Sequence, residues 1–149
     1  MVFLLIPLLA ASCISVNAPP DNDSDEKKTD GAFIHISKGA DDAHNVLMAL
    51  MLADLYASGE DPGYDVLVFF DKQGIEMVTR DAPNLEMEPF DPSDEIFARL
   101  VENGATIMAC PACMKVAGVE ESDLREGVRI ADKKKFFNFT EGRILSLDY

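Results

Sequence analysis

The stretch DVLVFF, residues 65–70, is an apolar run without polar alternation. A strand with one face in water alternates apolar and polar residues, whereas a strand covered on both faces is apolar nearly throughout. Residues 65–70 therefore predict a buried strand of a parallel sheet.

Similar short runs lie on both sides of this stretch and complete a set of five candidate strands. The other four are AFIHIS (32–37), ATIMA (105–109), VRIA (128–131) and RILSL (143–147). Helical patterns separate them, at 42–58, at 73–80, from Pro92 to Asn103-Gly104, at 111–117 and at 132–139. Alternating strands and helices predict a three-layer α/β/α domain with a five-stranded, mainly parallel sheet of flavodoxin- or Rossmann-like architecture.

The two long helices carry apolar residues at helical spacing, which predicts the face that each one buries. In the first helix the predicted stripe consists of Met48, Met51, Leu52, Leu55 and Tyr56. In the second helix the residues predicted to point inward are Ile96, Phe97, Leu100 and Val101.

Length and charge limit the possible classes of function. A chain of 149 residues is enough for one sizeable core. Its net charge of −14 argues against a nucleic-acid partner, because phosphates are bound by Lys and Arg. No apolar run reaches the roughly 18–20 residues of a membrane span.

Residues 1–18 have the pattern of an export signal. An apolar segment, Val2–Leu9, precedes small residues, and Ala10 and Ser12 occupy the −3 and −1 positions before Cys13. This arrangement resembles a bacterial lipobox and predicts that Cys13 carries a lipid. An ordinary secretory signal and a misassigned start codon are the alternatives.

Residues 19–31 are polar, acidic and led by proline, and they predict a flexible linker before a folded domain at 32–149. We expect a periplasmic or cell-envelope protein that touches the membrane only through its N-terminal lipid.

Two cysteines lie close together in ATIMACPACMKVAGV, residues 105–119. Cys110 ends a strand and Pro111 favours the first position of a helix, so Cys110 is the predicted N-cap and Cys113 the third helical residue. Free backbone N–H groups and the positive helix end favour a thiolate at Cys110, with a second thiol within reach.

Other polar residues should share the edge at which Cys110 lies, because functional groups of parallel sheets gather beyond the carboxyl ends of the strands. Ser37-Lys38-Gly39 and Asp71 each follow a predicted strand. Lys38 could supply positive charge to a thiolate there, or be a solvated loop lysine.

Three kinds of chemistry suit two neighbouring thiols. A structural zinc site needs four ligands, and only His35 and His44 are available beside the cysteines, without paired spacing. Thioredoxins place the motif after the first strand and face it with a later cis-proline, whereas here it follows the third strand and no proline comes after Pro111. A disulfide is compatible with the spacing, and so is sulfur relay, which needs only an activated, accessible cysteine.

The segments FIHISKG, VLVFFDKQGIEM and GATIMACPACMKVAGVEESDL resemble the DsrE/DsrF-like family of sulfur-relay (TusD-like) proteins, over about residues 32–149. Cys110, Gly118 and Val119 match its most specific element, and the C-P-x-C form resembles a less-characterised branch. The resemblance implies a five-stranded parallel sheet, a persulfide on Cys110, no cofactor and a homo-oligomer. Cys113 departs from the relay subunits and offers a resolving thiol.

Together these features favour a protein that handles sulfane sulfur or thiol redox at Cys110, with Cys113 as the resolving or modulating thiol. Its partner would be a protein that carries a thiol or a persulfide, and its activity would be that of a sulfurtransferase-like or thiol-redox protein. The alternative is a non-catalytic binding or assembly module whose CxxC forms a structural disulfide or a weak zinc site.

Overall fold

The computed structural model describes residues 29–59 and 63–149. The predicted signal at 1–18, Cys13 and the linker up to residue 28 lie outside the described residues. The fold begins at Gly31, one residue before the predicted boundary.

One five-stranded sheet organises the domain, with strand order β4-β3-β2-β1-β5. Its strands are β1 (Gly31–Ile36), β2 (Asp65–Phe70), β3 (Thr106–Ala109), β4 (Val128–Ile130) and β5 (Ile144–Asp148). Every neighbouring pair is parallel, so the predicted five-stranded α/β fold is confirmed and the sheet is parallel throughout.

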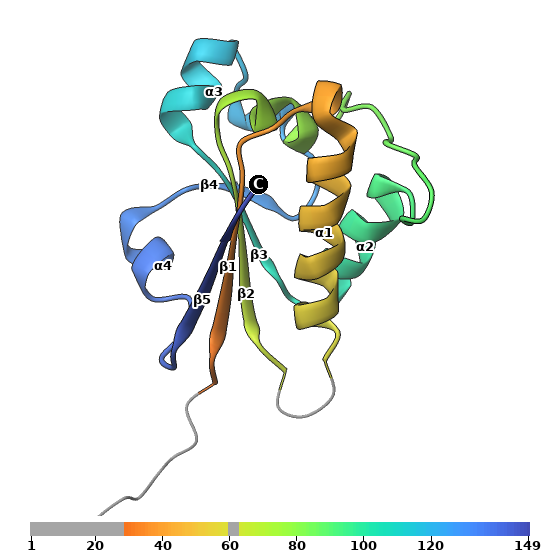
Figure 1. The fold of residues 1–149 in the computed structure, drawn as a ribbon. Coiled ribbons are helices and arrows are strands. Elements are labelled where there is room, and N and C mark those ends of the chain that lie inside the picture. The colour runs from red at the N-terminus through yellow and green to blue at the C-terminus, as the bar shows by residue number, and fades with distance from the viewer. Residues whose placement is uncertain (1–28, 60–62) are drawn as a thin grey trace, which may run out of the picture.

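Helices cover the sheet unequally (Figure 1). They are η1 (Ala40–Asp42), α1 (Ala43–Ala57), η2 (Lys72–Val78), α2 (Ser93–Glu102), α3 (Pro111–Ala117), η3 (Glu121–Asp123) and α4 (Lys133–Phe137). Helices α1 and α2 lie on one face, the short α4 lies on the other, and α3 lies beyond the carboxyl ends of the strands. None of the helices in the described part of the chain has the length and apolar character needed to cross a membrane.

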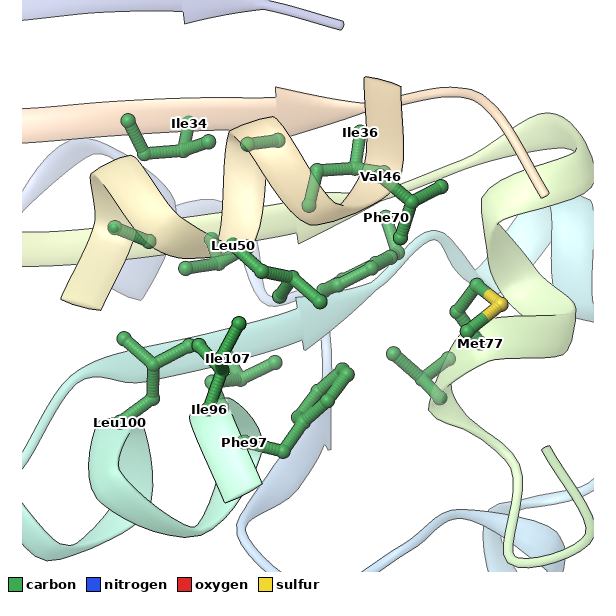
Figure 2. Close-up of a cluster of buried hydrophobic side chains, with 14 of the residues drawn as sticks. Ile34, Ile36, Val46, Leu50, Phe70, Met77, Ile96, Phe97, Leu100 and Ile107 are labelled. Atoms are coloured by element: carbon green, nitrogen blue, oxygen red, sulfur yellow. The ribbon is translucent and has the colours of Figure 1, made fainter. Parts of the chain in front are cut away.

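The core lies between the sheet and the pair α1 and α2 (Figure 2). Ile34, Val68 and Ile107 occupy one row across β1, β2 and β3, and all three are fully buried. At the carboxyl end of β2 the ring of Phe70 stacks on Phe97 of α2, with centroids 5.8 Å apart. This packing fixes the end of β2, from which Asp71 and η2 continue.

The predicted buried stripe of α1 is wrong. The helix buries Val46, Leu47, Ala49, Leu50 and Ala53, whereas Met51 is 39% exposed and Leu55 is 61% exposed. Apolar residues lie on every side of α1, so helical spacing fits more than one stripe. The small side chains of Ala49 and Ala53 belong to the face that approaches the sheet. In α2 the prediction holds for Ile96, Phe97 and Leu100, but Val101 at its end is 39% exposed.

The second face of the sheet is covered more thinly. Phe136 of α4 packs edge-on against Phe33 and Phe69, with centroids 5.4 Å and 5.1 Å away. Phe33 and Phe69 stay half-buried, and the next residue of α4, Phe137, is 71% exposed. The five-residue helix α4 is thus attached to the sheet largely through one aromatic ring.

The corrected face of α1 predicts unequal costs for two leucine truncations. Leu50→Ala should lower the free energy of unfolding by about 2–5 kcal/mol, because it leaves a cavity in a packed core. Leu55→Ala, on the exposed side of the same helix, should change it by no more than about 0.5 kcal/mol. Urea unfolding followed by circular dichroism measures both, and equal losses would contradict the burial described here.

Candidate functional site

Cys110 is held by the end of the sheet. Its N–H donates to the carbonyl of Phe70 at 2.9 Å and continues the pairing of β3 with β2. Its backbone is extended (φ −68°, ψ 116°), it is the N-cap of α3, and Pro111 opens the helix. Cys113 is the third residue of α3. The predicted local geometry is confirmed, and both cysteines are free and half-buried.

The glycine that follows α3 ends the helix within seven residues. Gly118 has φ +71°, a left-handed conformation that side chains with a Cβ adopt reluctantly. The N–H of Val119 then donates to the carbonyl of Met114 at 2.9 Å. This turn ends α3 after seven residues, and both thiols lie at the N-terminal end of the helix.

Lys72 takes part in the site through its backbone, which sequence reasoning missed. Among the described residues it is the single non-glycine with positive φ, at +46°. This conformation costs a residue with a Cβ roughly 1–2 kcal/mol. The backbone of Lys72 lowers the pKa of the Cys113 thiol.

The only sequence signal for this turn is Gly74. A Cβ at position 74 would lie 2.4 Å from the carbonyl oxygen of Ile36, so a side chain has no room there. The close approach of η2 to the end of β1 therefore requires glycine.

The surroundings of the two thiols are unequal. The pKa of Cys113 is raised above its ordinary value. The Lys72 N–H lowers this pKa, but loss of water, the hydrogen bond with Cys110 and negative charge on Cys110 and Asp71 outweigh it. A negative charge on Cys110 therefore acts against ionisation of Cys113.

His35 joins the same edge through two carboxylates. Its Nδ1 is hydrogen-bonded to Asp148 Oδ1 at 2.6 Å, and its Nε2 lies 3.0 Å from Asp71 Oδ1. The imidazole thus connects β1 to the ends of β5 and β2. Sequence reasoning considered His35 only as a half-buried strand residue or a zinc ligand, because the partners are far away along the chain.

Three other residues considered from the sequence, His44, Lys38 and Ser37, make their contacts with groups other than the two thiols. The His44 ring lies 5.7 Å from that of Phe90. The Lys38 ammonium lies 3.9 Å from Asp42, so its charge is directed to a carboxylate beside its own loop. Ser37 is tied to the chain end, since its N–H and hydroxyl both donate to the carbonyl of Tyr149.

No group of three or more His, Cys, Asp or Glu side chains within 29–59 and 63–149 is arranged to hold a metal ion. A groove of about 360 Å³ runs along α3, lined among others by Pro111, Met114, Val119 and Ile130, and neither cysteine contributes to its lining. Both thiols are half-buried at the N-terminal end of α3, packed against the edge of the core.

The comparisons with known proteins agree on one fold. The chain is similar to the ychN protein from E. coli at 16% identity, with a TM-score of 0.64 over 80% of this chain and 100% of that one. It is also similar to MTH1491, a protein of unknown function from Methanobacterium thermoautotrophicum, at 19% identity, with a TM-score of 0.58 over 80% and 99% of the two chains.

No curated protein matches the chain. The model of the DsrE/DsrF-like family matches residues 31–141, which include β1 to α4 and both cysteines of the site. The chain therefore belongs to the DsrE/DsrF-like family.

Proposed function

We propose that this chain handles sulfane sulfur, by persulfide relay or thiol redox, with Cys110 as the nucleophile and Cys113 as the resolving or modulating thiol. Membership of the DsrE/DsrF-like family supports a sulfur-relay type of function. The observation that carries the proposal is the pair of free, half-buried thiols in unequal surroundings.

The chemistry needs one thiolate and a donor. The Cys110 thiolate attacks the terminal sulfur of a donor persulfide, a new S–S bond forms, and the donor leaves as a thiolate. An acceptor thiolate then attacks the same terminal sulfur, and Cys110 leaves as a thiolate. The pKa of Cys113 is raised, so this thiol keeps its proton more readily and can stabilise negative charge on the neighbouring Cys110 sulfur.

The partial exposure of both thiols fits a donor or acceptor carried on another protein. The thiols are half-buried at the end of α3, and Val116 on the same helix is 90% exposed. An exposed apolar side chain beside a reactive group is a plausible contact for a protein that presents a thiol or persulfide. No nucleic acid is proposed as a partner of this acidic chain.

Exposure of the reduced protein to polysulfide should add the mass of one sulfur atom. We expect the adduct in the unsubstituted chain and in Cys113→Ser, and its loss in Cys110→Ser, because only Cys110 takes sulfur from the donor. Intact mass spectrometry measures all three proteins. An adduct that survives in Cys110→Ser but vanishes in Cys113→Ser would reverse the proposed roles.

We also propose that the chain is exported and carries a lipid on Cys13, as the pattern of residues 1–18 predicts. Palmitate fed to producing bacteria should label the unsubstituted chain and not Cys13→Ser, while Cys110→Ser keeps the label as a matched control. Equal labelling of the chain and Cys13→Ser would contradict the lipid assignment.

A homo-oligomer is the proposed state of the folded domain. Phe137 of α4 and Ile144 and Leu145 of the edge strand β5 are 71%, 55% and 45% exposed, and no strand within 29–59 and 63–149 pairs with the outer edge of β5. Sedimentation should give at least two chains per particle, and Phe137→Lys should shift the distribution toward one chain. A single-chain mass for the unsubstituted protein would contradict the proposal.

A further inference from the structure

Asp71 and Cys110 leave the sheet from neighbouring positions. Phe70 pairs with Ala109 across β2 and β3, and Asp71 and Cys110 are the next residues of each strand. The chain then turns at Lys72 into η2, which packs against α3, the helix that carries Cys113. The backbone of Lys72 lowers the pKa of Cys113, and the negative charge of Asp71 raises it.

The Asp71 carboxylate is in contact with the imidazole of His35. The contact between His35 Nε2 and Asp71 Oδ1 is 3.0 Å long, and both atoms are shielded from solvent and lack an aligned hydrogen bond. The imidazole itself is fixed by the hydrogen bond to Asp148 and lies beside the rings of Phe33 and Phe69 at 6.4 Å and 5.7 Å.

We propose that Asp71, positioned by His35, decides between two fates of a persulfide on Cys110: transfer to a partner, or release of its outer sulfur as hydrogen sulfide. This inference rests on the proposed function of Cys110. Asp71 is a positioning residue, because it acts through Cys113. Its charge changes the ionisation of the resolving thiol, and it does not touch the sulfur that is transferred.

The second fate is an internal redox step. The Cys113 thiol loses its proton to water, and its thiolate attacks the inner sulfur of Cys110–S–SH. The S–S bond between Cys110 and Cys113 forms, the bond to the outer sulfur breaks, and hydrosulfide leaves and takes up a proton. Two cysteine sulfurs are oxidised to a disulfide while the sulfane sulfur is reduced to sulfide, so no further oxidant is needed.

The first requirement of that step is a Cys113 thiolate. The groups that face Cys113 are the Lys72 N–H, Cys110 and Asp71. His35 on β1 faces Asp71, and Asp148 on β5 faces His35 from the other ring nitrogen. Removal of the charge on Asp71 takes away one cause of the raised pKa of Cys113, so the thiolate becomes more abundant at a given pH and resolution becomes faster.

The test measures Cys113 ionisation and sulfide release in Asp71→Asn. In a Cys110→Ser background, the midpoint of Cys113 alkylation against pH should move to lower pH when Asp71 becomes Asn. In the protein with both thiols, persulfidation should yield several-fold more hydrogen sulfide, with a matching rise in the Cys110–Cys113 disulfide. Asp71→Ser is a second neutral variant, and circular dichroism checks the fold of each.

Two matched controls make the result specific. Asp71→Glu keeps the charge and should keep both the alkylation profile and the sulfide yield. Asp42→Asn removes another carboxylate, one that lies 3.9 Å from Lys38, and should also leave both unchanged. If His35 positions Asp71, the effect of Asp71→Asn should shrink in a His35→Gln background, as a double-mutant cycle measures.

Unchanged alkylation midpoints and sulfide yields in both neutral variants of Asp71 would overturn the inference. Failure of the proposed function has a different signature: Cys113→Ser then acquires no sulfur on Cys110, whatever Asp71 does to the ionisation of Cys113.

Discussion

The backbone hydrogen bond from Cys110 to Phe70 is the contact on which the rest of the site depends. It extends the pairing of β2 and β3 by one residue and fixes where both chains leave the sheet. From that point α3 carries Cys113 one turn on, and the backbone of Lys72 lowers the pKa of its thiol. The packing of Phe70 on Phe97 holds the same strand end from the side of α2. The reactive edge is thus built on the most buried part of the sheet.

The proposed chemistry depends on a difference in surroundings between two thiols that are three residues apart, since the pKa of Cys113 is raised. Cys113 lies beside the carboxylate of Asp71 and the sulfur of Cys110, and both disfavour its ionisation. Cys110 stands at the end of the strand, where a partner can approach. In the proposed function the sulfur atom is carried to and from these half-exposed thiols by another protein. The family to which the chain belongs is consistent with such a role.

The strands and the local geometry of the cysteine pair could be predicted from the sequence, because both have signals in neighbouring residues. Apolar runs such as 65–70 mark buried parallel strands, and Cys110-Pro111 marks the start of a helix. The buried face of α1 could not be predicted, since apolar residues surround that helix and only the packed partner selects Leu50 over Leu55. Two further features could not be predicted from the sequence, because they join segments that meet only in the folded sheet. They are the left-handed turn at Lys72 and the contacts of His35 with Asp71 and Asp148.

In the proposed function Cys110 carries the transferred sulfur in the unaltered protein. To locate that sulfur, the unsubstituted chain is treated with a limiting amount of polysulfide, persulfides are trapped by alkylation, and the labelled position is assigned by peptide fragmentation. We expect a trapped sulfane sulfur on Cys110 with the Cys113 thiol unmodified. A trapped sulfane sulfur on Cys113, or none on either cysteine, would contradict it.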